Sequence, residues 1–134
     1  MNPRHLLIGT TRGLYTSDPR APVQLDGRPI TALATESGAL WAIVDGEELW
    51  HRTHAGRWKL IASASPWRAL CVLPSARGTY VGTAEAHLLR LADDRLVRVD
   101  AFDAVPGRDA WFTPWGGPPG YPSRSPPAET AIST

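Results

Sequence analysis

The stretch LWAIVDGEELWHR, residues 40–52, overlays the stretch TYVGTAEAHLLRL, residues 79–91, without a gap, and we call the shift that takes position 40 to position 79 the repeat offset. An aromatic residue matches an aromatic residue near the start of the two stretches, and a pair of bulky residues matches near their end. A third copy, residues 7–15, fits the same template once one residue is dropped from its turn. Three copies with a period of roughly 35 to 39 residues indicate a repeat architecture.

Short apolar runs recur along the chain and are broken, roughly every 8 to 12 residues, by Gly, Pro, Asp or Ser. This spacing favours β-strands over helices, whose 3.6-residue periodicity is hard to find here. The connecting segments carry residues that accept tight or left-handed turns, such as Ser37-Gly38 and Asp45-Gly46. The strands that we expect are residues 6–10, 13–16, 23–25, 30–35, 40–44, 49–52, 58–62, 69–73, 79–83, 87–91 and 96–99.

Each copy of the repeat contains an apolar strand, a strand that ends in small residues, a strand with paired bulky residues and a more polar closing strand. A blade of a β-propeller requires four antiparallel strands at this period, because its inner strand is buried, its outer strand faces water and its faces stack on neighbouring blades. A β-sandwich also has many short strands, but it has no reason to repeat at this period. We therefore expect an all-β fold, a partial β-propeller of about three four-stranded antiparallel blades.

The positions at which the copies of the repeat begin and end predict the boundaries of the domain and of its blades. We place the partial propeller at residues 1–117, with blades at roughly 5–26, 28–63 and 68–103. The first copy begins at its second strand, so its blade is expected to lack the inner strand. Residues 118–134 are rich in Pro and Ser and have no apolar pattern, which predicts a disordered tail. We expect the chain to be a truncated N-terminal portion of a longer propeller, through natural truncation or a frame shift.

The composition excludes several classes of partner. Hydrophobic residues make up 43% of the chain and charged residues 20%, with 14 Lys and Arg against 13 Asp and Glu. This balance leaves no excess charge to attract nucleic acid or an anionic membrane, so we expect neither as a partner. Cys71 is the only cysteine, which excludes an intramolecular disulfide and suits a reducing compartment. No stretch approaches the roughly 18 apolar residues of a membrane span, and residues 6–8 are too short a run for a signal peptide. We expect a cytoplasmic chain.

Residues 8–17, IGTTRGLYTS, resemble the strand pair GT-x-x-G-L-Y-x-S that is common at the start of BNR or sialidase-like repeat propellers. Gly56, Arg57 and Trp58 resemble the end of the Asp-box turn between the third and fourth strands of such blades. The full turn of that family reads S-x-D-x-G-x-T-W, whereas residues 52–58 have lost both the Ser and the Asp and are one residue shorter. The resemblance covers about residues 5–117 and implies a bacterial member of the Asp-box-type propellers.

Sialidase chemistry in that family requires an arginine cluster, a tyrosine nucleophile and acidic partners from several blades. A fragment does not assemble these groups, so we expect a non-catalytic propeller scaffold or a module that binds a protein, peptide or glycan, without a cofactor. The alternative is a fragment of a sialidase-like glycoside hydrolase or lyase whose catalytic residues lie in missing blades, or a degenerate product without activity. Open blade edges and faces predict self-association.

The tryptophans divide into two groups. Trp41, Trp50 and Trp58 lie in expected strands and are predicted to pack between blades. The others lie in connections from an outer strand towards the next inner strand, which in propellers open at the end of the ring where ligands usually bind. Aromatic planes beside charged groups suit contacts with peptides or sugars, although such residues also simply cap the ends of blades. The predicted ligand-binding surface consists of Trp67, Arg68, Arg108, Asp109, Trp111 and Trp115.

No catalytic or metal-binding residue is predicted. His51 and His54 lie three residues apart, which in a strand points them to opposite faces, so a solvated turn is the simpler interpretation. His87 is expected to be a hydrogen-bonded polar neighbour on a strand. Cys71 falls within an apolar strand, where a thiol is usually inert packing.

Overall fold

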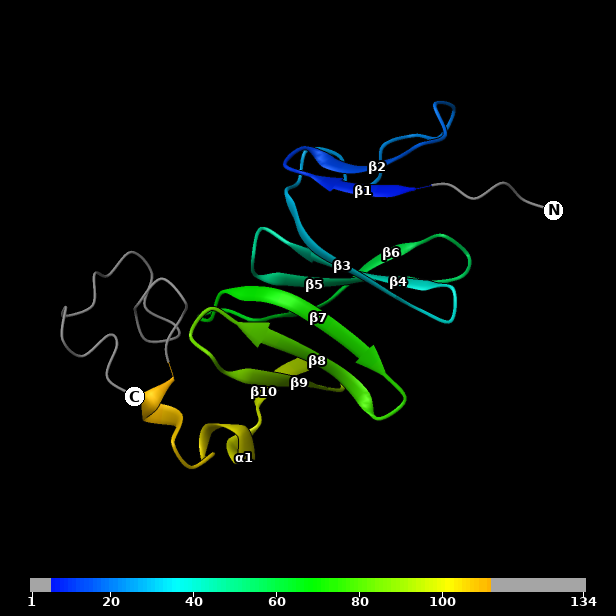
Figure 1. The fold of residues 1–134 in the computed structure, drawn as a ribbon. Helices are drawn as coiled ribbons and strands as arrows, with labels where there is room; N and C mark the ends of the chain where they lie inside the picture. The colour runs from blue at the N-terminus through cyan, green and yellow to red at the C-terminus, as the bar shows by residue number, and fades with distance from the viewer. Residues whose placement is uncertain (1–5, 112–134) are drawn as a thin grey trace, which may run out of the picture.

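The computed structural model describes residues 6–111, and Figure 1 shows them as three antiparallel sheets that follow one another in chain order. The first sheet is a hairpin of β1 (Leu7–Thr10) and β2 (Gly13–Thr16). The other two sheets, which we call the middle sheet and the last sheet, have four strands each.

The middle sheet consists of β3 (Ile30–Glu36), β4 (Ala39–Val44), β5 (Glu48–Arg52) and β6 (Trp58–Ser63). The last sheet consists of β7 (Ala69–Ser75), β8 (Gly78–Thr83), β9 (Leu88–Ala92) and β10 (Arg95–Arg98). In both sheets each strand pairs with the strand that follows it in sequence, in the orders β3-β4-β5-β6 and β10-β9-β8-β7. Each of the two sheets is therefore a simple meander, in which tight turns join consecutive strands.

The structure confirms the all-β prediction, since strands make up 52% of the described residues and helices 7%. Ten of the eleven expected strands are present in this part of the chain, with ends that agree to within two residues. The remaining one, residues 23–25, is reduced to a single bridge between Gln24 and Leu14. None of the three sheets formed by residues 6–111 closes on itself. The assignment of these sheets to propeller blades stays a prediction.

The sequence repeat is also a structural repeat. The repeat offset relates β3 to β7 and β4 to β8 from end to end. It also relates a register shift between Ile30 and Ala32 in β3 to one between Ala69 and Cys71 in β7. Because a bulge is a specific local feature of a strand, its recurrence shows that the two copies share backbone geometry as well as composition.

The middle sheet is buried on both of its faces. Leu40, Ala42 and Val44 of β4 belong to a core cluster shared with the hairpin, whereas Ile43 belongs to a second cluster shared with the last sheet. Trp41 packs against that second cluster. Successive side chains of a strand point to opposite faces, so the near-continuous apolar run of β4 supplies both clusters.

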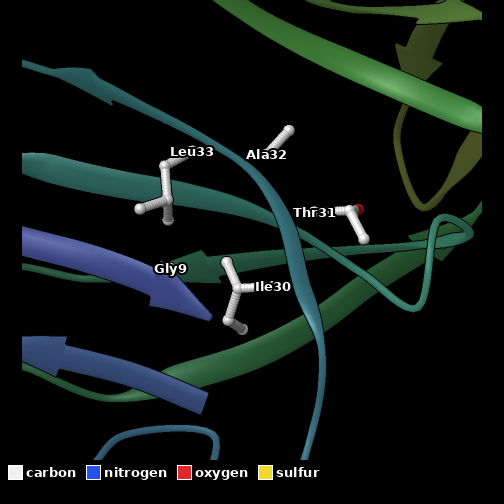
Figure 2. A pocket seen from close by; sticks show the side chains of 5 residues that line it. All are labelled: Gly9, Ile30, Thr31, Ala32 and Leu33. Atoms are coloured by element: carbon white, nitrogen blue, oxygen red, sulfur yellow. The ribbon is translucent and has the colours of Figure 1, made fainter. Parts of the chain in front are cut away.

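Gly9 of β1 sits at the seam between the hairpin and the middle sheet. Figure 2 shows it facing Ile30 and Leu33 on β3, where these residues line a shallow pocket with Thr31 and Ala32. A Cβ atom at position 9 would lie 2.8 Å from Cγ2 of Ile30, which is too close for two carbon atoms. Glycine at this position therefore allows β1 to approach β3.

Two short helices, which were not predicted from the sequence, follow the last sheet: α1 (Asp100–Asp103) and η1 (Arg108–Ala110). Helices of four and three residues are too short to show an amphipathic period, so the sequence pattern gives no sign of them. The predicted tail, residues 118–134, lies outside the described residues. Within residues 6–111, no helix has the length and apolar character needed to cross a membrane.

Candidate ligand-binding surface

Asp103 joins helix α1 to the last sheet. Nδ1 of His87, immediately before β9, lies 2.7 Å from Oδ1 of Asp103, and Nε of Arg98, at the end of β10, donates to Oδ2 at 2.9 Å. One carboxylate thus holds two strand ends and the first turn after the sheet together. The hydrogen bond from His87 lowers the pKa of Asp103, Arg98 acts in the same direction, and desolvation opposes them.

His87 also contacts Trp67, which lies in the connection between β6 and β7. The two rings meet edge to face, with centroids 4.5 Å apart and planes at 60°. The guanidinium carbon of Arg98 lies 5.5 Å from the centroid of the Trp67 ring, within range of a cation–π interaction. Trp67 packs on the core cluster between the middle and last sheets, and it is half-buried. Its remaining exposed surface borders the charged side chain of Arg98.

Arg108 of η1 lies near Asp103 and packs against two aromatic rings. Its Nη2 donates to the carbonyl oxygen of Ala86 at 2.5 Å, in the turn between β8 and β9. Its guanidinium carbon lies 5.1 Å from the ring centroid of Trp111 and 5.6 Å from that of Phe102, and the two rings are 5.6 Å apart. Its Nη1 is buried, and within the described residues it has no hydrogen-bond partner. Arg108 is therefore held by Ala86 and by the two rings, while its buried Nη1 group makes no hydrogen bond to residues 6–111.

The structure brings together three of the six predicted surface residues. Trp67 and the pair Arg108–Trp111 lie at the same end of the last sheet, connected through His87 and Asp103. Arg68 and Asp109 are exposed, and the side chains of both make no polar contact within residues 6–111. Trp115 lies outside the described residues.

Four residues that contact Trp67, Arg108 or Trp111 directly or through one another were not predicted from the sequence to lie on the ligand-binding surface: His87, Arg98, Phe102 and Asp103. The prediction that His87 is a hydrogen-bonded polar neighbour is confirmed by its contact with Asp103. The aspartate lies 16 residues further along the chain, in a helix that has no sequence signal. A charged residue at the end of a predicted strand, such as Arg98, was the available hint, but it does not identify its partner.

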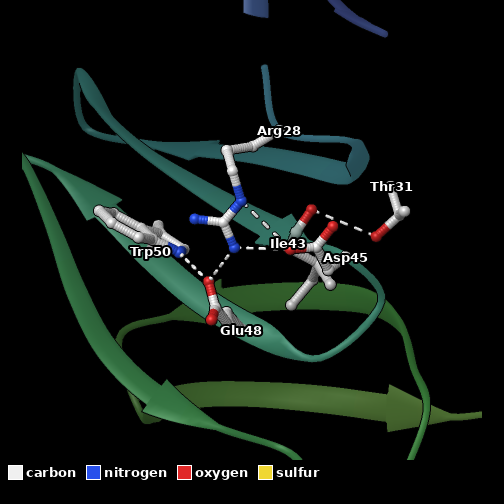
Figure 3. A network of polar contacts seen from close by, with 6 residues as sticks. All are labelled: Arg28, Thr31, Ile43, Asp45, Glu48 and Trp50. Atoms are coloured by element: carbon white, nitrogen blue, oxygen red, sulfur yellow. Dashed lines mark hydrogen bonds and ion pairs between the residues drawn. The ribbon is translucent and has the colours of Figure 1, made fainter. Parts of the chain in front are cut away.

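The corresponding turn of the middle sheet carries a polar network, shown in Figure 3. Nη2 of Arg28 donates to Oδ2 of Asp45 at 2.5 Å and to Oε1 of Glu48 at 2.8 Å. Nε1 of Trp50 donates to the same Glu48 oxygen at 3.0 Å. Hydrogen bonds to Asp45 and then to Glu48 raise the pKa of Arg28. Oδ2 of Asp45 and Oε1 of Glu48 therefore both accept hydrogen bonds from within the network.

The repeat offset relates Arg28 to Trp67 and Glu48 to His87. The ion pair of the middle sheet and the aromatic contact of the last sheet therefore occupy equivalent places. The same backbone positions are joined by different chemistry in the two copies. Aromatic character at this place is thus a property of the last sheet and not of the repeat.

Two residues away from this surface, His51 and Cys71, lie in environments that differ from those expected from the sequence. His51 is not in a solvated turn: it lies in β5, half-buried, with its ring centroid 4.3 Å from that of Trp41. Desolvation, followed by the charge of His54, lowers the pKa of His51. Cys71 does lie in a strand, β7, but its side chain is exposed and does not pack inside the core. Alternation along β7 places Cys71 on the face of the last sheet that points away from the middle sheet.

Among residues 6–111, no group of three or more His, Cys, Asp or Glu side chains is arranged to hold a metal ion. The arrangement around Arg108 offers aromatic planes, a fixed cation and hydrogen-bond donors, which are groups that can bind a ligand. Comparison of the chain with protein-family models, with curated proteins and with solved structures finds no match.

Proposed function

We propose that this chain is a non-catalytic binding module built from propeller-type blades, and that a protein, peptide or glycan binds at the surface formed by Trp67, Arg98, Arg108 and Trp111. The observation that carries the proposal is the environment of Arg108. Its guanidinium lies over the rings of Trp111 and Phe102, and its Nη1 has no hydrogen-bond partner among the described residues. A buried donor without a partner is costly, so a bound acceptor at this position would be favoured.

The propeller assignment is supported by the repeat and by the packing. Two consecutive four-stranded meanders share one core cluster face to face, and the strand bulge recurs at the same position in both. Stacking of four-stranded sheets through apolar faces is the packing of propeller blades. The single cysteine of the chain supports a reducing compartment, and we propose the cytoplasm.

The test is a binding screen of the purified chain on a glycan array and on an array of short peptides, with Trp111→Ala and Arg57→Ala as paired variants. Arg57 is exposed in the turn between β5 and β6 of the middle sheet and is not part of the proposed surface, so its loss tests whether binding depends only on nonspecific charge. We expect at least one probe to bind wild type, to lose about tenfold or more in affinity with Trp111→Ala, and to bind Arg57→Ala unchanged. Absence of any bound probe, or equal binding by both variants, would contradict the proposal.

The competing class is a sialidase-like hydrolase or lyase. It is separated from a binding module by incubating the chain with a fluorogenic sialoside. We expect no release of fluorophore above that of an inactive protein at the same concentration. Release that scales with the concentration of the chain would favour the enzyme class.

A further inference from the structure

The last sheet presents a face that no other described element covers; Cys71, Leu73 and Tyr80 form its apolar part, and the exposed Arg90 of β9 pairs beside Tyr80. Alternation along the strands places Cys71 and Leu73 of β7 on this face, opposite their cross-strand partners Gly82 and Tyr80 of β8. Leu73 is 63% exposed and Cys71 is exposed. The opposite face of the same strands carries Val72 and Val81, which belong to the core cluster shared with the middle sheet.

The internal repeat shows what such a face packs against. The repeat offset relates Cys71, Leu73 and Tyr80 to Ala32, Ala34 and Trp41. In the middle sheet, those three residues pack against the core cluster that the last sheet completes. The free face of the last sheet is therefore equivalent, one repeat further along the chain, to the face of the middle sheet that packs on the last sheet.

The opposite end of the molecule carries the complementary surface. Ile8 and Tyr15 pair in register on the hairpin and are 47% and 38% exposed. The repeat overlay places Ile8 over Val81, and places Tyr15 over Leu89 once the one-residue difference in the turn is allowed for. Val81 and Leu89 are 0% and 1% exposed, because they face the preceding sheet. Figure 1 shows the hairpin and the last sheet at the two ends of the stack.

We propose that two copies of this chain associate head to tail, with the hairpin face around Ile8 and Tyr15 of one copy packed on the face around Cys71, Leu73 and Tyr80 of the next. The contact continues the interface that the middle and last sheets form within each chain. A second copy is the occupant because each chain supplies both sides of that interface, one at each end. The contact is heterologous, so it closes into a ring or extends into longer assemblies. It does not involve the surface around Arg108 and Trp111, and it goes beyond the proposed function.

The first test is the mass in solution, measured by light scattering over a range of concentrations. Wild type is expected to rise above its monomer mass of 14.5 kDa with concentration. Leu73→Asp, which buries a charge in the proposed contact, is expected to stay at the monomer mass. The matched control is Leu60→Asp, the same change at a leucine of β6 that is 47% exposed and lies on neither end face; it is expected to associate like wild type. A wild-type monomer at every concentration, or equal behaviour of the two variants, overturns the proposal.

The second test does not depend on a destabilising substitution. Ile8→Cys adds one thiol at the hairpin end, and the native Cys71 supplies the other, so a short bismaleimide linker joins neighbouring copies across packed sheets about 10 Å apart. We expect efficient cross-linking of Ile8→Cys, and little for wild type or for Arg57→Cys, whose added thiol lies in a turn of the middle sheet. Cross-linking that is equally efficient in all three proteins rules out the head-to-tail contact.

Discussion

Asp103 shows how one side chain fixes a segment that has little structure of its own. Helix α1 has four residues, no buried residue and no side-chain cap at its N-terminus, so its position depends on contacts outside the helix. Asp103 provides them through His87 and Arg98. The residue that orders this end of the last sheet therefore lies in the helix and not in the sheet.

We predict that Asp103→Asn lowers the stability of the chain at neutral pH, and that the difference from wild type disappears in acid. The pKa of Asp103 is lowered in the folded chain, first by the hydrogen bond from His87 and then by Arg98. A lowered pKa means that the carboxylate stabilises the folded state above the ordinary aspartate range, about pH 4, and that this contribution is lost as pH falls through the folded value. Urea unfolding of both proteins between pH 7 and pH 3 measures the difference.

Asp109→Asn is the matched control for this prediction. Asp109 is exposed in η1 and, within residues 6–111, forms no ion pair. Its substitution is expected to leave the urea midpoint unchanged at every pH. A constant difference between Asp103→Asn and wild type across the whole pH range would show that the carboxylate charge is not the cause.

At the scale of elements, the contact between the middle and last sheets depends on a few fully buried side chains. We predict that Leu89→Ala, in β9 and 1% exposed, destabilises the chain by about 2–5 kcal/mol, since it removes apolar contacts and leaves a cavity between two sheets. Leu60→Ala, on the exposed side of β6, is expected to change stability by less than about 0.5 kcal/mol. Denaturant unfolding of the two variants checks both values. Similar losses for the two leucines would show that burial between the sheets is not what stabilises them.

The strands were predictable because their signals are local. An apolar run bounded by turn residues, as in residues 40–44 before Asp45-Gly46, indicates a strand whatever lies elsewhere in the fold. The candidate surface was only half predictable, since Asp103 reaches His87 across 16 residues through a helix without a periodic pattern. Cys71 illustrates a further limit: alternation divides the residues of a strand between two faces, but it does not say which face has a neighbour.

At the scale of the whole molecule, the three sheets differ in how many of their faces pack on a core cluster. The middle sheet has a core cluster on each face, the last sheet has one on a single face, and the hairpin has two strands packed on one cluster. An isolated two-stranded hairpin is marginally stable in water, so the hairpin depends on its contact with β3. We therefore expect amide hydrogen exchange to be slowest in the middle sheet and fastest in the hairpin.

Gly9→Ala tests whether the hairpin opens as a separate unit. The added methyl group would lie 2.8 Å from Cγ2 of Ile30, and Ile30 is too buried and too stiff at its branched Cβ to move away freely. Overpacking of this kind costs about 1–3 kcal/mol, which corresponds to an exchange that is about fivefold to about 160-fold faster for any amide that is exposed when the hairpin opens. The amides to follow are those of Leu14 and Gln24, which bond to each other's carbonyl groups at 2.7 Å and 2.9 Å. Amides of β8 and β9 should keep their wild-type rates, and Thr11→Ala, at the exposed turn of the hairpin, should leave all of them unchanged. If exchange instead accelerates equally in all three sheets, the stack unfolds as one cooperative unit, and the hairpin has no independent opening.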